Sequence, residues 1–280
     1  MRALTIVIVS YNTRNELEAC LRSLHDSPPS TSHEIVVVDN ASSDGSAAAV
    51  RAAWPDVQVI DAGSNVGYAR ANNLGIRATS SHFILLLNSD TVVPRGAIDG
   101  LIDRLQSRPD VGAVGPRLID HNGQPELSFG RMVGPFSELL QKGKRLALAG
   151  DFPVVASWIR RSLERPTARD WVSGACLLVR RTDAERVGLL DEQFFLYLED
   201  VDFCAALRRA GRQVWFSPDI EVVHHRGRSG ATSPAATRTA YRLSQLAFYD
   251  KHHPSWAPYL RLYLRAKGEL PAETPTASRT

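Results

Sequence analysis

The stretch Leu4-Thr5-Ile6-Val7-Ile8-Val9-Ser10 decides the fold class of this 280-residue chain. It is a nearly continuous run of apolar and β-branched residues. Strands without polar–apolar alternation are typical of parallel sheets that are covered on both faces. The run follows Met1-Arg2, as the apolar part of a signal peptide does, but it has no small-residue cleavage site and leads directly into Tyr11-Asn12. We therefore interpret it as a buried first strand.

Strand and helix patterns alternate outward from this run through the first half of the chain. Further strands are expected over residues 34–39, 57–61, 83–88 and 111–115. Helices are expected between them, from Thr13 onward, over 47–54, after Gly67 to about 78, and from Pro94 to about 107. Thr13 with Glu16 predicts a capping box, and Pro94 is typical of a first helical turn. This alternation predicts an α/β fold with a mostly parallel central sheet flanked by helices.

The second half of the chain is less regular. A turn is expected at 121–123, and residues 129–169 are rich in Lys and Arg with no clear period beyond a helix over 136–148. The remaining pattern predicts a strand over 171–180, a helix over 199–210 closed by Gly211, short strands over 213–216 and 220–224, and helices over 235–252 and 257–267. The tail at 268–280 has the composition of a disordered segment.

The overall composition excludes several classes of protein. With 44% hydrophobic and 22% charged residues, the chain is neither disordered, collagen-like nor a coiled coil. A net charge of +3 is too small to indicate a nucleic-acid partner. The apolar runs are too short to span a bilayer. The three isolated cysteines, Cys20, Cys176 and Cys204, fit no metal spacing and are expected in the core of a cytoplasmic protein.

Polar residues end the first four predicted strands. These endings are Ser10-Tyr11-Asn12, Asp39-Asn40, Asp61 and Asn88-Ser89-Asp90. Ligands of open parallel sheets lie beyond the carboxyl ends of the strands, so the endings predict one shared site. Alternatively, each residue only caps the next helix. That alternative suits Asn12, but it accounts poorly for Asp90, because Thr91-Val92-Val93 separates Asp90 from the next helix.

The first strand-to-helix turn limits which classes of ligand the predicted site can bind. Residues 10–14 contain no glycine, so a dinucleotide bound in the usual glycine-rich turn is excluded, and no Walker-type phosphate loop is present. The charge of a bound diphosphate would then fall to a divalent metal and an arginine.

Six segments, taken together and in order, resemble family 2 glycosyltransferases of the GT-A fold, and in particular their bacterial rhamnosyltransferase-like branch. The resemblance covers about residues 4 to 225. The segments are Val9-Ser10-Tyr11-Asn12, Val38-Asp39-Asn40-Ala41-Ser42-Ser43-Asp44-Gly45, Asn65-Val66-Gly67-Tyr68-Ala69-Arg70-Ala71-Asn72-Asn73-Leu74-Gly75, Leu87-Asn88-Ser89-Asp90, Trp171-Val172-Ser173-Gly174-Ala175 and Phe194-Phe195-Leu196-Tyr197-Leu198-Glu199-Asp200-Val201-Asp202.

The resemblance implies roles on the donor side. Asp39 would accept the imide N–H of a uracil or thymine base, which it cannot distinguish. Asp90 would bind Mg²⁺ or Mn²⁺, although Asn88 replaces the first carboxylate of the usual Asp-x-Asp motif. His224, 24 residues after Asp200 (224 minus 200), would be a second metal ligand, whereas His225 would point to the other face of its strand. The other nucleotide-sugar-binding residues would be Ser10, Tyr11, Asn12, Asn65, Arg70, Asn88 and Ser89.

On the acceptor side, the resemblance implies that Asp200 is the catalytic base. A helix N-terminus favours its carboxylate form. Glu199 is placed on the acceptor side with Trp171, Ser173 and Gly174. The alternatives are that Glu199 and Asp202 only complement the helix dipole and that Trp171 is a core residue.

The resemblance therefore implies an inverting, metal-dependent transferase that moves a sugar, rhamnose above others, from TDP-rhamnose or a UDP-sugar to a glycan, lipid-linked or small-molecule acceptor. Because Asn88 replaces the first carboxylate of the motif, a non-catalytic nucleotide-sugar-binding domain remains the alternative. A phosphohydrolase would need an aspartate nucleophile after the first strand, which this chain lacks.

The expected organisation is a transferase domain over 1–230, C-terminal helices over 231–267 and a disordered tail over 268–280. The transferase domain would divide into a nucleotide-sugar half at about 1–115 and an acceptor half at about 116–230. The helix over 256–267 mixes aromatic and basic residues. Either it rests on the inner face of an anionic membrane, or it packs Leu260 and Leu264 on the core and leaves its arginines in solvent. The oligomeric state stays open.

Overall fold

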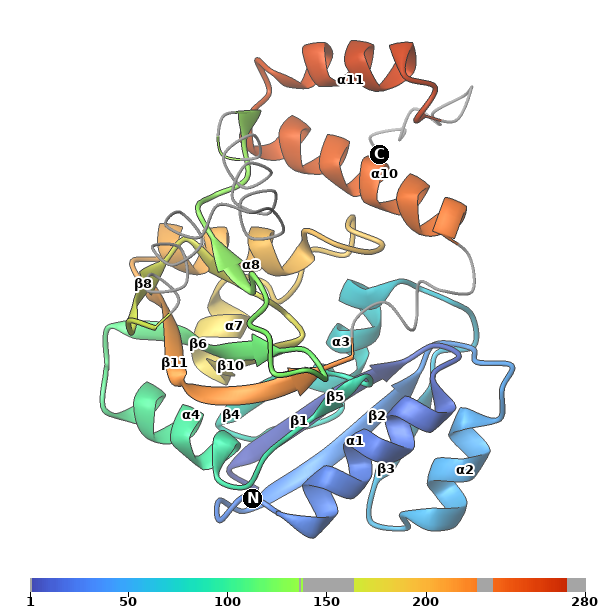
Figure 1. Ribbon diagram of the computed structural model, residues 1–280, viewed down its shortest axis with the longest axis vertical. Helices are drawn as coiled ribbons and strands as arrows, with labels where there is room; N and C mark the ends of the chain where they lie inside the picture. Colours follow the sequence, from blue (N-terminus) through green and yellow to red (C-terminus); the bar gives the residue numbers. More distant parts are fainter. Residues whose placement is uncertain (1, 136, 138–163, 226–233, 271–280) are drawn as a thin grey trace.

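The computed structural model describes residues 2–135, 137, 164–225 and 234–270. The predicted helix over 136–148 and the tail beyond residue 270 lie outside these residues. The described chain forms a layered α/β fold with a central sheet (Figure 1). The predicted fold class is therefore confirmed.

A nine-stranded sheet forms the centre of the molecule, with β1 (Leu4–Ser10) inside it. All seven residues of β1 are buried, as the sequence predicts. The strand order is β3 (Gln58–Asp61), β2 (His33–Asp39), β1, β4 (Phe83–Asn88), β10 (Cys176–Arg180), β6 (Val111–Ile119), β11 (Gln213–His224) and β5 (Thr91–Val92), with β8 (Thr167–Arg169) paired to β11. The sheet thus contains strands from both predicted halves of the transferase domain.

The sheet is parallel in its first part and mixed in its second. β3, β2, β1 and β4 are parallel to one another, and β6 is parallel to β11. β10 lies between β4 and β6 and is antiparallel to both, while β5 and β8 are antiparallel to β11. The uniformly parallel pairing therefore ends where strands of the second half of the chain join the sheet, although β11 is again parallel to β6.

Helices cover both faces of this sheet (Figure 1). Leu4, Ile6 and Ile8 of β1 pack in the cluster that contains α1 (Arg14–Asp26), α2 (Ser46–Ala53) and α4 (Ala97–Gln106). Val7 and Val9 pack in the cluster that contains α3 (Tyr68–Arg77), α7 (Arg181–Arg186) and α8 (Glu199–Arg209). Alternate side chains of one strand thereby enter two cores, which explains why the strand has no polar face. All three cysteines are buried and unpaired, as expected.

The C-terminal helices α10 (Pro234–His252) and α11 (Ala257–Ala266) form a further layer beyond α8 (Figure 1). A third apolar cluster joins them to α8 and includes Phe194, Val201 and Phe248. Buried Asp202 of α8 also binds α10, because its carboxylate lies 2.9 Å from Lys251 Nζ and 2.6 Å from His252 Nε2. Asp202 therefore does more than complement the dipole of its helix.

One predicted helix cap and one predicted helix start are wrong. Thr13 is the N-cap residue of α1, but its side chain makes no capping hydrogen bond. The Thr13 hydroxyl instead contacts Ser89 Oγ at 2.8 Å, so there is no capping box. α4 begins at Ala97 and not at Pro94, because Gly96 adopts a left-handed φ of 78° immediately before the helix.

Two predicted strand boundaries also differ from the structure. The strand expected over 171–180 is divided into β9 (Trp171–Val172), which pairs with β7 (Phe129–Gly130), and β10. Between them the N–H of Ser173 donates to Ser128 O and that of Gly174 to Asp200, so neither donor is used in a continuous ladder. The strands expected at 213–216 and 220–224 form the single strand β11, with a register irregularity between Ser217 and Glu221.

Candidate active site

The polar strand ends meet at one edge of the sheet, as predicted. Ser10 is aligned with Asp39, Val9 with Asn88, and Asp39 with Asp61 in the pairing of neighbouring parallel strands. Because these strands are parallel, their carboxyl ends and the following loops share one side of the molecule.

Asp39 has one carboxylate oxygen available for a ligand. Its Oδ2 accepts a 3.0 Å hydrogen bond from the N–H of Ser42. Its Oδ1 is buried, and no donor among the described residues reaches it. A buried carboxylate oxygen without a donor is costly, so this atom is suited to accept an N–H from a bound molecule.

The loops around Asp39 are held by asparagine side chains. Asn12 Oδ1 accepts the N–H of Ser43 at 2.7 Å, which ties the loop after β1 to the loop after β2. Asn65 Oδ1 accepts Asn40 Nδ2 at 2.8 Å and the N–H of Gly67 at 3.2 Å. The amide oxygens of Asn12 and Asn65 therefore stabilise the loops that line the site.

Gly67 also brings a neighbouring loop close to α3. It has a φ of 85°, and a Cβ at this position would lie 2.5 Å from Phe195 O. Arg70, on α3, is 59% exposed and lies 3.8 Å from Glu192 Oε2. This weak surface pairing leaves the guanidinium of Arg70 able to reach an anionic ligand. Tyr11 is half-buried on the loop after β1.

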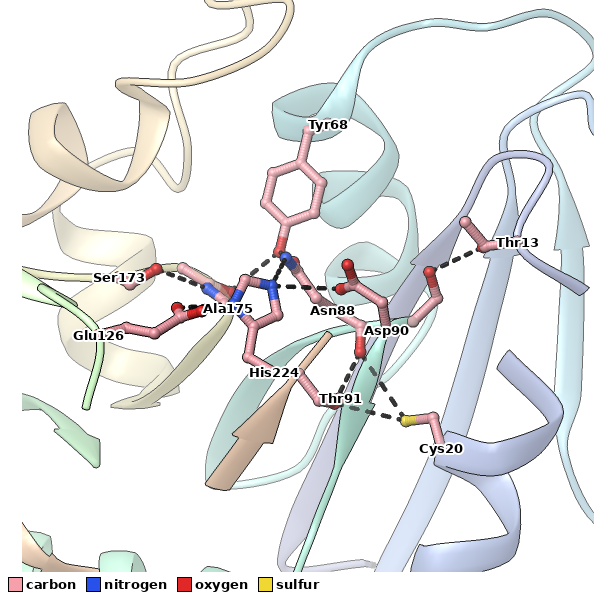
Figure 2. A network of polar contacts seen from close by, with 12 residues as sticks. Thr13, Cys20, Tyr68, Asn88, Asp90, Thr91, Glu126, Ser173, Ala175 and His224 are labelled. Atoms are coloured by element: carbon pink, nitrogen blue, oxygen red, sulfur yellow. Dashed lines mark hydrogen bonds and ion pairs between the residues drawn. The ribbon is translucent and has the colours of Figure 1, made fainter. Parts of the chain in front are cut away.

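Asp90 and His224 come together beyond β4, although they lie far apart in the sequence (Figure 2). The distance from Asp90 Oδ1 to His224 Nε2 is 3.3 Å, and both side chains are at least nine-tenths buried. Asn88 approaches the same imidazole, with Nδ2 3.4 Å from Nε2. His225 does not join them: its backbone N–H donates to Asp90 O. The structure therefore brings together the metal-site residues that the resemblance implies.

Glu126 is a site residue that sequence reasoning missed. Its Oε2 lies 3.1 Å from His224 Nδ1, on the side of the ring opposite Asp90 (Figure 2). Burial lowers the pKa of His224, but the hydrogen bonds and charges of Asp90 and Glu126 outweigh burial and raise the pKa to about 9. Glu126 follows the turn at 121–123, in a stretch without periodicity, so no local signal indicated it.

Tyr68 is the second site residue without a predicted role. Its hydroxyl donates to Asn88 Oδ1 at 2.8 Å and lies 3.0 Å from Gly174 O (Figure 2). Burial raises its pKa well above the usual value, and the nearby carboxyl groups of Glu199, Asp200 and Asp90 contribute in the same direction. The phenol therefore stays protonated and connects the Asn88 side of the site to Gly174. The only sequence signal for Tyr68 was its place in the segment over 65–75 that carries the family resemblance.

A chain of hydroxyls links the first strand to the loop after β4. Ser10 Oγ lies 3.2 Å from Thr13 Oγ1, which lies 2.8 Å from Ser89 Oγ. All three residues are buried. Ser10 and Ser89 are thus close together, as expected of residues that line one site.

Asp200 is held at the start of α8 by two backbone donors. The N–H of Gly174 donates to Oδ2 and that of Val201 to Oδ1, each at 2.8 Å. Burial raises the pKa of Asp200, although these hydrogen bonds oppose the shift. Neighbouring Glu199 has its pKa raised well above the usual value, by burial and then by the charge of Asp200. The charge of Asp200 is thus a cause of the raised pKa of Glu199, so the first negative charge of the pair resides on Asp200.

The remaining predicted acceptor residues lie beside this pair. The indole N–H of Trp171 donates to Arg131 O at 2.9 Å, and its ring packs against two apolar clusters. Ser173 Oγ accepts the N–H of Ala175 at 3.3 Å. Trp171 is therefore at least partly a core residue, which is the alternative that the sequence left open.

The residues at Asp90 fit a divalent cation whose coordination sphere is completed by a bound ligand. A distance of 3.3 Å is suitable for two neighbouring ligands on one ion with bonds of about 2.0–2.4 Å. The described residues contain no cluster of three or more His, Cys, Asp or Glu side chains arranged to hold a metal. One carboxylate and one imidazole are instead typical of sites where substrate phosphates and water complete the coordination.

Comparison with known proteins identifies close sequence relatives. The family model of "Glycosyl transferase family 2" matches residues 5–165, more than half of the chain. The chain is 33% identical over 283 residues to an "N-acetylglucosaminyl-diphospho-decaprenol L-rhamnosyltransferase" of Mycobacterium tuberculosis, covering 94% of this chain and 89% of that protein. It is 27% identical to the "Low-salt glycan biosynthesis hexosyltransferase Agl10" of Haloferax volcanii, covering 79% and 67% of the two chains.

Solved structures share the fold at lower identity. The mannosyltransferase PcManGT from Pyrobaculum calidifontis, in complex with GDP-Man and Mn²⁺, aligns with a TM-score of 0.62 and 20% identity over 94% of this chain and 69% of that one. GalNAc-T7 with UDP, GalNAc and Mn²⁺ aligns with a TM-score of 0.61 and 16% identity, over 95% and 58%. At these identities the likeness shows the fold alone, which is GT-A as the resemblance implied.

Proposed function

The chain belongs to glycosyl transferase family 2, and from this premise we propose that it is an inverting, metal-dependent rhamnosyltransferase. The donor would be TDP-rhamnose or a UDP-sugar, and the acceptor a hydroxyl of a lipid-linked sugar. The rhamnosyltransferase relative, which matches nearly the full length of the chain, supports the sugar and the acceptor class. A cytoplasmic location stays a prediction.

The donor nucleotide would bind over the ends of β1 and β2. The uncompensated Oδ1 of Asp39 would accept the imide N–H of the base. The asparagine-braced loops would surround the nucleoside, with Tyr11 and Ser10 on the β1 side. Arg70 would reach the diphosphate. A uracil and a thymine offer Asp39 the same N–H, so other contacts must select between them.

Asp90 and His224 would hold Mg²⁺ or Mn²⁺. When bound, the ion neutralises diphosphate charge and stabilises the leaving nucleotide. An imidazole ligand favours Mn²⁺ over Mg²⁺, because Mg²⁺ prefers an all-oxygen sphere. The Mn²⁺ complexes among the structural neighbours support a divalent ion as the cofactor. Asn88 would be oriented by its hydrogen bond from Tyr68 and would contribute no charge to the site.

Asp200 would act as the general base. It takes the proton from the acceptor hydroxyl while that oxygen forms a bond to the anomeric carbon, and the bond from that carbon to the diphosphate oxygen breaks on the opposite side. The nucleoside diphosphate leaves with the bonding electrons. A single displacement needs only one base. Glu199, whose pKa is raised by burial and by the charge of Asp200, would contact the acceptor beside the base.

The contact that carries this proposal is the Tyr68 bridge. Its hydroxyl reaches Asn88 and Gly174, and Gly174 in turn donates to Asp200. One phenol therefore lies within two hydrogen bonds of both the base and the residues beside the metal ligands. The donor and acceptor sides of a glycosyl transfer need this proximity.

The test is a donor panel with the purified chain. TDP-rhamnose, UDP-sugars and GDP-sugars are incubated with Mn²⁺, Mg²⁺ or a chelator, and nucleotide release and thermal shift are measured. We expect a metal-dependent shift and transfer with TDP-rhamnose above the others. Asp200→Asn should keep the donor shift and lose about a hundredfold or more in turnover. Absence of a metal-dependent response to every nucleotide would refute the donor site, and full activity of Asp200→Asn would refute the base.

A further inference from the structure

α11 has two faces of different character. Ala257 and Leu264 are buried, and Leu260 packs against the cluster that joins α8, α10 and α11. This confirms that the helix packs on the core, one of the two interpretations that the sequence allowed. The opposite side, which we call the outer face of α11, consists of Trp256, Tyr259, Leu262 and Tyr263.

The outer face is apolar although it is exposed. Tyr259 is 68% and Leu262 69% exposed, and Tyr259 lies about one helical turn from Trp256, from Leu262 and from Tyr263. The described residues contain seven exposed large apolar side chains, and four of them are on this face. A helix that borders only water carries polar residues on its outer side, so the gathering of four apolar side chains indicates a surface that is covered in use.

The charges beside the outer face are all positive. No Asp or Glu occurs between residues 251 and 268. Arg261 is paired with Asp250, and neighbouring Glu269 with Arg242. Arg265 and Lys267 are exposed, and no carboxylate in the described part of the chain lies within ion-pair distance of either. Arg265 and Lys267 therefore border the apolar side chains with no carboxylate within ion-pair distance, and Lys267 Nζ lies 4.9 Å from the ring centre of Tyr263.

This combination selects an anionic lipid surface as the partner. Tyr and Trp are suited to the boundary between water and hydrocarbon, because each has an apolar ring and a polar tip. Lys and Arg beside them are attracted to lipid phosphates. A second copy of the chain fits less well, because a twofold interface would bring like charges together with no acid to balance them.

The position of α11 permits such contact. It is the outermost element at one end of the long axis of the molecule, with α10 between it and the sheet (Figure 1). A flat surface can therefore approach the outer face without contacting the central sheet. No helix in the described residues has both the length and the hydrophobicity to cross a bilayer, so the contact would be peripheral.

We propose that the outer face of α11 docks on a bilayer surface that contains anionic phospholipids. Tyr259 and Leu262 enter the boundary between head groups and acyl chains, and Arg265 and Lys267 contact lipid phosphates. This inference goes beyond the proposed function and holds whichever sugar is transferred.

The experiment is co-sedimentation of the full chain with vesicles of phosphatidylcholine alone or of phosphatidylcholine and phosphatidylglycerol in equal amounts. We expect tighter partition onto the anionic vesicles, weakened by added salt. Tyr259→Ser with Leu262→Ser should lower the partition coefficient at least about tenfold, because two apolar side chains no longer leave water. Arg265→Gln with Lys267→Gln should remove the preference for anionic vesicles.

Leu243→Ser is the matched control, because Leu243 is an exposed apolar residue of α10 outside this face, and its change should leave partition unaltered. Thermal unfolding should be unchanged in every variant, since the replaced side chains are exposed. Equal partition of the Tyr259 and Leu262 variant, equal binding to both vesicle types, or a homodimer in light scattering that this variant dissociates would each overturn the proposal. Transfer to a soluble acceptor, measured in parallel, tests the proposed function separately.

Discussion

The backbone N–H of Gly174 donates a 2.8 Å hydrogen bond to Oδ2 of Asp200, and a Cβ added to Gly174 would lie only 3.1 Å from Cβ of Asp200. The same residue therefore orients the carboxylate and leaves room for it. Gly174 has no positive φ, so its function here is close approach and not backbone freedom.

Gly174→Ala should displace Asp200 by a few tenths of an ångström and weaken this hydrogen bond. We expect turnover to fall about tenfold to a hundredfold, because small misplacements of a catalytic group are costly. Donor affinity, measured by calorimetry, should not change. Gly100→Ala is the matched control: its Cβ would lie 3.1 Å from Ile220, away from the site. Equal turnover of the two variants would contradict the prediction.

Glu199→Gln should change how stability depends on pH. Burial and the charge of Asp200 raise the folded pKa of Glu199 well above its usual value of 4.5. The folded state then binds the proton more strongly than the unfolded state, so wild-type stability falls as pH rises above 4.5 toward the raised pKa. Glutamine has no proton to lose, so the variant should gain stability over wild type as pH rises.

Chemical denaturation across this range of pH measures that gain. Glu185→Gln serves as the control, because Glu185 is an exposed residue of α7. A difference between wild type and Glu199→Gln that does not grow with pH would show that Glu199 is ionised in the folded protein.

The two adjacent histidines should differ in their effect on metal binding. His224→Ala removes the imidazole that lies 3.3 Å from Asp90, whereas His225 contacts Asp90 only through its backbone. Mn²⁺ affinity in the presence of nucleoside diphosphate, measured by calorimetry, should therefore fall strongly in His224→Ala and little in His225→Ala. Similar losses in both variants would exclude His224 as the ligand.

Glu126 should position His224. Its Oε2 lies 3.1 Å from His224 Nδ1, which directs Nε2 toward Asp90. Glu126→Ala should weaken Mn²⁺ affinity about tenfold to a hundredfold, as loss of the partner of a ligating histidine does. Glu126→Gln keeps an oxygen acceptor and should restore much of it. Glu221→Ala, a change on the same strand as His224, is the control. No loss in Glu126→Ala would refute the role.

Local patterns predicted the parts of the fold that a single segment specifies. β1 has no polar face because both of its sides enter a core, and that property is visible in seven residues. The polar strand ends were predictable for the same reason, since parallel strands bring their ends to one edge. The insertion of β10 between β4 and β6 was not, because the direction of a strand leaves no mark in its own composition.

The missed site residues depend on contacts between distant segments. Glu126 reaches His224 across 98 positions, and Tyr68 reaches Gly174 across 106. Thr13 has the sequence context of a capping box, yet its hydroxyl is used 76 positions away at Ser89. In each case tertiary contact overrides a local preference, and the sequence around the residue carries no sign of the partner.

The carboxylate of Asp202 has a consequence for the catalytic turn. Two residues after the base, it holds Lys251 and His252 of α10 in one buried ion cluster. A chain that lacked α10 would lose both of these contacts to Asp202. We expect the first turn of α8 to become less well ordered as a result, and Asp200 to be displaced with it. The C-terminal helices therefore stabilise the position of the base. We expect that truncation of the chain before α10 would lower the rate of transfer.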